Sequence, residues 1–176
     1  MKPVDYYAEV STPDLGDKTL DVAVIGNGSF GTAMANLIVH NGHRVVLYGR
    51  NKAALDVMKE TRVNSRYLPD ALLSEKLEYT NDLSGAVKGR DIVVFAVPAQ
   101  TFRQVSADAS QYLAEGIIAV NLAKGIEKNT LKRMSEVAAE TIPQVRYVGL
   151  SGPTHAEEIV MNVPAGIVAV STDPEA

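Results

Sequence analysis

The sequence predicts an α/β domain built on a doubly wound, mainly parallel sheet. Two observations carry this prediction: short apolar runs alternate with helix-patterned segments, and the run at residues 92–97 is apolar at every position. Strands of this second kind are typical of parallel sheets, because crossover helices bury both of their faces. The length of 176 residues allows one substantial core and is short for two full-size domains.

The expected elements follow the strand–helix order of βαβ units. The expected strands span residues 20–25, 44–48, 76–79, 92–97, 116–121 and 146–150, with a further apolar run at 165–170. The expected helices span residues 28–41, 83–88, 100–113, 130–142 and 156–161, and another begins after the N-cap Asn51. In the helix at 130–142, Leu131, Met134 and Ala138 are expected to face the core.

Two stretches are expected to be irregular. Residues 1–19 lack periodicity and contain Pro3 and Pro13, so we expect a flexible extension without chemistry, ahead of one domain at residues 20–176. Residues 64–81 are interrupted by a proline and by scattered charges. We therefore expect a long loop there, apart from its one short strand.

Composition argues against several classes of protein. A net charge of −4 gives no reason to expect a nucleic-acid partner. The absence of cysteine excludes disulfides and thiolate metal sites, and His40, His43 and His155 lack the spacing of metal ligands. No apolar stretch approaches the roughly 20 residues of a membrane span, and the N-terminus lacks a signal pattern. A cytoplasmic location is therefore expected.

A glycine-rich loop follows the first expected strand and precedes a helix. Gly26, Gly28 and Gly31 form the pattern GxGxxG inside a βαβ unit, and this context points to a dinucleotide site. Gly26 permits a tight turn, Gly28 leaves room for a pyrophosphate, and Gly31 lets the helix pack on the sheet. Free N–H groups at the helix start would bind the pyrophosphate. A glycine-rich turn without a ligand is the alternative.

Ligands of such sheets lie at the carboxyl ends of the strands, so residues just after each strand are candidates. Arg50 follows the second strand, near the position where an acidic residue would favour NAD. Its guanidinium suits a 2′-phosphate, so we expect NADP to bind at least as well as NAD. An ordinary surface arginine is the alternative.

Lys124 and the segment 151–158 follow two later strands. An ammonium at Lys124, aimed inward by a turn at Gly125, would meet an anionic substrate or polarise a carbonyl. A solvated surface lysine is the commoner outcome. In the segment 151–158, Thr154 is a candidate helix cap, and His155 is a candidate for proton transfer. A structural or partly exposed histidine is the favoured interpretation of His155.

Four segments form an ordered set over most of the chain. They are Gly26-Asn27-Gly28-Ser29-Phe30-Gly31-Thr32-Ala33, Val97-Pro98-Ala99-Gln100, Asn121-Leu122-Ala123-Lys124-Gly125-Ile126-Glu127 and Ser151-Gly152-Pro153-Thr154-His155-Ala156-Glu157-Glu158. Together they resemble the bacterial NAD(P)-dependent glycerol-3-phosphate dehydrogenases, which have a Rossmann-type cofactor domain. That family exchanges a hydride between sn-glycerol 3-phosphate and dihydroxyacetone phosphate, and so provides the glycerol backbone for phospholipid synthesis.

The resemblance implies roles for positions in the loops that follow strands. They are cofactor contacts at Ser29, Phe30, Arg50 and Ala156, substrate contacts at Gly152 and Thr154, and contacts with both at Lys124. The cofactor would be NADP or NAD, and the substrate a small phosphorylated molecule. For the complete enzyme, the resemblance also suggests a homodimer.

In the family, a helical domain follows the cofactor domain and supplies the proton-transferring lysine. This chain ends at Ala176, so the resemblance implies the cofactor-binding half of such an enzyme and assigns no catalytic base within it. Lys124 is not expected to replace that base. We therefore expect weak cofactor binding and little or no turnover from this polypeptide alone.

Two other functions fit the glycine loop. A related NADP-dependent reductase of hydroxy acids or keto acids would share the loop without needing Lys124 beside residues 152–156, and competition by glycerol 3-phosphate would distinguish it. A nucleotide-sensing module would change its assembly on binding the cofactor and show no hydride transfer. The fold alone does not choose among these functions.

Overall fold

One sheet forms the centre of the structure. The computed structural model describes residues 2–8 and 18–176, and within them seven strands pair in the order β3-β2-β1-β4-β5-β6-β7. The strands are β1 (Asp21–Ile25), β2 (Arg44–Tyr48), β3 (Glu78–Thr80), β4 (Ile92–Phe95), β5 (Ile118–Asn121), β6 (Arg146–Ser151) and β7 (Val168–Val170). All neighbouring strands are parallel except β7, which is antiparallel to β6. The predicted doubly wound, mainly parallel sheet is confirmed, and its strand order is that of Rossmann-type domains.

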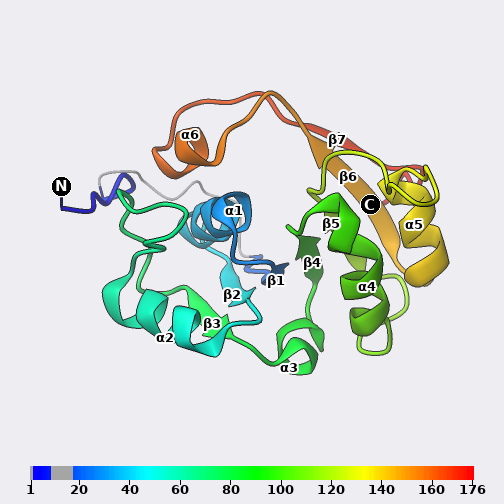
Figure 1. Cartoon of the computed structure of the whole chain (residues 1–176), viewed down its shortest axis with the longest axis horizontal. Coiled ribbons are helices and arrows are strands. Elements are labelled where there is room, and N and C mark those ends of the chain that lie inside the picture. Colours follow the sequence, from blue (N-terminus) through cyan, green and yellow to red (C-terminus); the bar gives the residue numbers. More distant parts are fainter. Residues whose placement is uncertain (1, 9–17) are drawn as a thin grey trace.

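Helices cover both faces of this sheet (Figure 1). They are α1 (Ser29–His40), α2 (Lys52–Thr61), α3 (Leu83–Val87), α4 (Ala99–Ser110), α5 (Met134–Thr141) and α6 (Ala156–Val160). Two buried cores result, with α1, α2 and α6 on one face and α3, α4 and α5 on the other. Val24 of β1 belongs to the first core, whereas Ala23 and Ile25 belong to the second. The strand is therefore buried on both faces, as is typical of a parallel sheet covered by helices on both sides.

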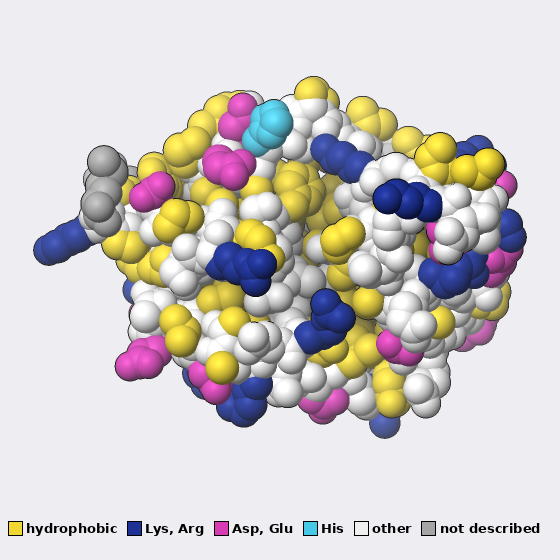
Figure 2. All heavy atoms as spheres, viewed as in Figure 1, with side chains coloured by type: hydrophobic (Ala, Val, Ile, Leu, Met, Phe, Trp, Pro, Cys, Tyr) yellow, Lys and Arg dark blue, Asp and Glu magenta, His cyan; other side chains and the backbone are white. Residues whose placement is uncertain are grey.

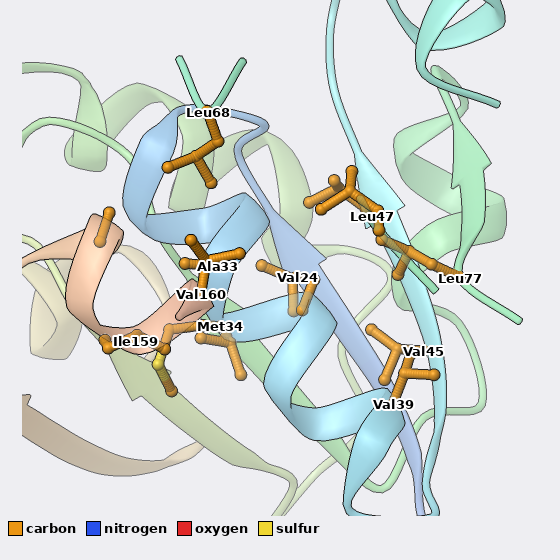
Figure 3. Packing of buried hydrophobic residues seen from close by; sticks show 14 of the residues in the cluster. Val24, Ala33, Met34, Val39, Val45, Leu47, Leu68, Leu77, Ile159 and Val160 are labelled. Carbon is orange, nitrogen blue, oxygen red and sulfur yellow. The ribbon is translucent and has the colours of Figure 1, made fainter. Parts of the chain in front are cut away.

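Figure 3 shows the first core where α1 and α6 meet. Ala33 and Met34 of α1 lie near Ile159 and Val160 of α6, and all four side chains are buried. A helix of five residues is too short to be stable on its own. This apolar contact therefore holds α6 in place.

Two predicted helix boundaries are confirmed by their local chemistry. The Oδ1 atom of Asn51 accepts a hydrogen bond from the N–H of Ala54 at 3.1 Å, which caps the N-terminus of α2. Beyond the end of α1, Gly42 takes a φ of +90°, a conformation that suits glycine after a helix. Both signals can be identified in the sequence, because each depends on one residue type.

The helix expected at 130–142 begins four residues later than predicted, at Met134. Leu131 takes a φ of +58°, and a bridge between Ile126 and Arg133 turns the chain back on itself before α5 starts. As a result, Leu131 is 76% exposed and does not face the core, contrary to our expectation. Met134 and Ala138 are buried as predicted.

The last apolar run forms a shorter strand than the sequence suggests. Of residues 165–170, only Val168–Val170 pair with β6, and these residues are exposed. β7 is therefore an edge strand of the sheet, not a buried parallel one. Among the described residues, no helix is both long enough and apolar enough to cross a bilayer.

Residues 2–8 of the N-terminal segment, which the sequence predicts to be a flexible extension, contact the domain. The N–H of Val4 donates to the carbonyl of Asp70 at 2.9 Å, and its own carbonyl accepts from the N–H of Leu72 at 2.8 Å. Tyr7 is only 4% exposed. The middle of the extension, up to residue 17, lies outside the described residues.

Candidate functional site

The glycine-rich loop between β1 and α1 has the backbone that its sequence predicts. Gly26 takes a φ of +119°, and a Cβ there would lie 2.5 Å from the carbonyl oxygen of Ala96. A Cβ at Gly31 would overlap the carbonyl oxygen of Gly26. At Gly28, a Cβ would meet no described atom within 4 Å. The first and third glycines therefore allow the loop to fold, and the second leaves its outer surface open.

The N-terminus of α1 starts beside this open position. Within the described part of the chain, no side chain caps the helix at Gly28, and its first turn contains no acid. The N–H of Thr32 donates to the carbonyl of Gly28 at 3.0 Å. The N–H groups of residues 29–31 therefore have no acceptor within the helix. These donors and the helix dipole together favour an anion.

A buried amide that sequence reasoning missed holds the glycine loop. Asn64 is 4% exposed, and its Nδ2 atom donates to the carbonyl of Asn27 at 3.0 Å and to Oγ1 of Thr32 at 2.8 Å. On the other side of the loop, a Cβ at Gly49 would lie 2.7 Å from the Asn27 side chain. Asn64 was missed because it begins a stretch expected to be a long loop, and nothing in the sequence shows that this loop folds back over the glycines.

Arg50 lines a hollow beside the glycine loop. The hollow has a volume of about 890 Å³, and its lining includes Asn27, Asn51, Arg66 and Tyr67. The guanidinium of Arg66 lies over the Tyr67 ring, 5.1 Å from its centroid. Among the described residues, no carboxylate forms an ion pair with Arg50. An aromatic face and two guanidinium groups suit a planar base that carries a phosphate.

Lys124 lies beside two other predicted site residues. Its Nζ atom donates to the carbonyl of Gly152 at 3.0 Å and lies 5.6 Å from the centroid of the Phe30 ring. Gly125 takes a φ of +115°, which provides the turn that the sequence suggests. The first turn of α1 and the loops after β5 and β6 therefore meet at Lys124. Arg50 is not part of this group, because it lines the hollow on the α2 side of the glycine loop.

The segment before α6 differs from the prediction in its cap. His155, not Thr154, occupies the N-cap position, and its N–H donates to Oε2 of Glu158 at 3.2 Å. Thr154 is 7% exposed and donates its N–H to the carbonyl of Gly152 at 2.9 Å. Ala156 is buried as well. The exposed side chain of His155 agrees with the structural interpretation of this residue.

A family model described as the N-terminus of NAD-dependent glycerol-3-phosphate dehydrogenase matches residues 21–176. The chain belongs to this family. Two relatives carry the name glycerol-3-phosphate dehydrogenase (NAD(P)+). The one from Acinetobacter baylyi is 42% identical over 167 residues, which cover 94% of this chain and 46% of the relative. The one from Carboxydothermus hydrogenoformans is 42% identical over 159 residues, which cover 89% of this chain and 47% of the relative.

This chain therefore spans about half the length of these curated relatives. A solved structure of glycerol-3-phosphate dehydrogenase from Coxiella burnetii matches with a TM-score of 0.83 and 28% identity, over 89% of this chain and 48% of that one. The Saccharomyces cerevisiae enzyme matches with a TM-score of 0.79 and 23% identity, over 90% of this chain and 49% of that one, which supports the fold. The resemblance based on four motifs is confirmed.

The loop that carries Lys124 is held to α4 by hydrogen bonds. Arg103 donates to both carboxylate oxygens of Glu127, at 2.8 and 3.0 Å. The side-chain amide of Gln100 accepts from the N–H of Lys128 at 2.9 Å and donates to the carbonyl of Ile126 at 2.8 Å. Hydrogen bonds from Arg103 and then Thr130 lower the pKa of Glu127 to about 2.

The pairing of Arg103 with Glu127 was not among the predictions made from the sequence. Glu127 ends one of the four motifs, but its partner Arg103 lies 24 positions away and belongs to a different element. A charge that is only 8% exposed needs such a partner. The sequence alone shows neither the burial nor the pairing.

Proposed function

We propose that this chain binds NADP or NAD and serves as the cofactor-binding half of a glycerol-3-phosphate dehydrogenase. The observation that carries the proposal is the uncapped N-terminus of α1 beside Gly28, with the Arg50 hollow on one side and Lys124 on the other. The helix start can bind an anion, the hollow has room for a nucleoside, and Lys124 is an exposed cation. Together these three features fit a dinucleotide.

The described residues fit such a cofactor. The loop of Gly26, Gly28 and Gly31, with the N–H groups of Ser29 and Phe30, would hold the pyrophosphate. Arg50 would meet the adenosine end, and its guanidinium suits the 2′-phosphate of NADP. Lys124 and Ala156 would lie toward the nicotinamide end, on the other side of Phe30. Figure 2 supports an anionic ligand, since Lys and Arg side chains lie around the middle of the face seen there and most acids lie toward its rim.

The proposed reaction exchanges a hydride between sn-glycerol 3-phosphate and dihydroxyacetone phosphate. When bound, the nicotinamide supplies or accepts the hydride. Lys124 would attract the phosphorylated substrate and polarise its carbonyl, and the segment with Gly152 and Thr154 would line it. Phe30 would exclude water beside Lys124. We assign no proton-transferring base to this chain, and we expect little turnover from it alone.

The proposal also includes the cellular location, the metabolic role and the assembly of the protein. We place it in the cytoplasm, in the supply of glycerol phosphate for phospholipid synthesis, with a homodimer as the assembly of the complete enzyme. The net charge of −4 supports a chain without a nucleic-acid partner.

Gly28→Val tests the cofactor site directly. The new side chain would project into open space, so the fold should tolerate it, but it would obstruct the approach of a pyrophosphate. In calorimetric titrations we expect the chain to bind NADPH and NADH, and the variant to lose at least about tenfold in affinity for both. The control is Ala139→Val, at an exposed position of α5. Failure of the unaltered chain to bind either nucleotide, or unchanged binding by the Gly28 variant, contradicts the proposal.

A further inference from the structure

The packed N-terminal residues lie outside the part of the chain that the family model matches, which begins at residue 21. They nevertheless contact the domain at two places. Val4 forms a parallel bridge with Ala71 in the loop before β3. Tyr7 contacts both α6 and α1.

Tyr7 connects the two helices that flank the candidate site. Its hydroxyl donates to the carbonyl of Ile159 in α6 at 2.7 Å, and its ring stacks on His40 of α1, with 4.3 Å between centroids and 13° between planes. Burial raises the pKa of Tyr7 to about 12. The phenol therefore stays protonated, and remains a donor, over the whole neutral range.

The position of α6 bears on the site because the chain reaches α6 directly from Gly152. The carbonyl of Gly152 accepts hydrogen bonds from Lys124 and from the N–H of Thr154. Only Pro153, Thr154 and His155 separate Gly152 from the first residue of α6, so the turn and the helix are directly connected. A displacement of α6 would therefore move the acceptor that holds Lys124.

We propose that Tyr7 is a positioning residue, which fixes α6 against α1 and thereby places Gly152 and Lys124 at the nicotinamide end of the site. This inference rests on the proposed function for its effect on the cofactor. Its structural part, the restraint of α6, does not depend on any ligand. The adenosine end is independent of this restraint, because the hollow of Arg50 is lined by the glycine loop, α2 and the segment after it.

The test compares Tyr7→Leu, which loses the hydroxyl and the ring stack, with Tyr7→Phe, which keeps the ring. Amide hydrogen exchange of the full chain without ligand reports on α6. Calorimetry with NADPH and with 2′,5′-ADP then separates the two ends of the site, since 2′,5′-ADP lacks the nicotinamide half. The control is Tyr112→Phe, which removes a hydroxyl beside the second core.

We expect Tyr7→Leu to speed exchange in residues 156–163 but not in α4. We also expect it to weaken the binding of NADPH about threefold to tenfold and to leave the binding of 2′,5′-ADP unchanged. Tyr7→Phe should lie between Tyr7→Leu and the unaltered chain, and Tyr112→Phe should match the unaltered chain. Unchanged α6 exchange in both Tyr7 variants overturns the proposal.

If Tyr7→Leu weakens the binding of NADPH and of 2′,5′-ADP equally, the proposal is also overturned, because that result indicates a loosened domain and not a displaced α6. If Tyr7→Leu does not fold, Tyr7→Phe alone decides by the same two measurements. If the unaltered chain binds neither ligand, the proposed function fails, and the exchange of α6 still decides whether Tyr7 restrains the helix.

Discussion

Arg50 is the residue at which the choice between NADP and NAD is expected to lie. It is exposed at the carboxyl end of β2 and lines the hollow with Arg66 and Tyr67. Because a 2′-phosphate is a doubly charged acceptor, a guanidinium here favours NADP, and an acid at this edge of the sheet favours NAD through the ribose hydroxyl.

We predict that Arg50→Asp reverses this preference. The variant should lose about tenfold or more in affinity for NADPH, the size expected for one charge-assisted hydrogen bond, while NADH binding changes less. Calorimetry with both nucleotides measures the ratio of the two affinities. Lys88→Asp is the matched charge reversal, since Lys88 is exposed at the opposite end of the strands, before β4. A ratio equal to that of the unaltered chain would remove Arg50 from this role.

At the residue scale, the sequence predicts positions whose role depends on their own type. Gly26 must take a positive φ, and Lys124 must follow a strand, so both can be found from the pattern. Asn64 and Tyr67 cannot be found in this way. Their roles depend on a loop that folds back over the glycines, and this return is set by tertiary contacts such as the hydrogen bond from Asn64 to Asn27.

Among the elements, the loop after β5 depends most on charge. Glu127 receives two hydrogen bonds from Arg103, and Thr130 donates a further one to the same carboxylate. Arg103 also pairs with Glu140 of α5 at 2.8 Å. The loop, α4 and α5 are therefore joined by one ionic network, in which Glu127 is buried, Arg103 is half-buried and Glu140 is exposed.

We predict that Glu127→Gln loosens this loop while leaving the sheet intact. The neutral amide cannot accept both Arg103 donors as a carboxylate does, so hydrogen exchange at residues 122–133 should become several-fold faster. NADPH binding should weaken, because Lys124 lies in the same loop. Asp56→Asn breaks an exposed pair with Lys52 and serves as the control. Unaltered exchange in the loop would show that Gln100 is sufficient to hold it.

The spacing of apolar residues predicts the central strands and the longer helices, because it indicates both the type of element and the face of that element that is buried. It fails for Leu131, since an apolar residue at helical spacing before Met134 takes a left-handed conformation in the actual turn. It also fails for Tyr7, because a single buried ring in a short segment has no period to detect.

At the scale of the whole molecule, His40 and Glu127 are among the groups whose titration makes the stability depend on acid. Burial lowers the pKa of His40 from its ordinary 6.5, although the nearby Asp5 opposes this, and Arg62 and Lys76 reinforce it. The Nε2 atom of His40 is buried and lacks a hydrogen-bond partner among the described residues. The neutral imidazole therefore stacks on Tyr7, and the unfolded chain takes up the proton first.

We predict that the free energy of unfolding is highest above pH 6.5 and declines as the pH falls below it, because protonation of His40 favours the unfolded state. A second decline should begin below about pH 4.5, where Glu127 loses its charge in the unfolded chain before the folded one. Urea titrations at pH 7.5 and 5.5 measure the first step. His40→Gln should reduce it, and His155→Gln, at an exposed position, should not. An identical decline in the His40 variant would refute this assignment.

The open side of β7 affects how this polypeptide behaves in concentrated solution. β7 ends the sheet beyond β6, and Val168 and Val170 are 61% and 63% exposed. An edge strand with one open side and exposed valine side chains is a template onto which a strand of a neighbouring molecule can add. We therefore expect this polypeptide to aggregate by edge-to-edge growth at high concentration and to stay dispersed in dilute samples.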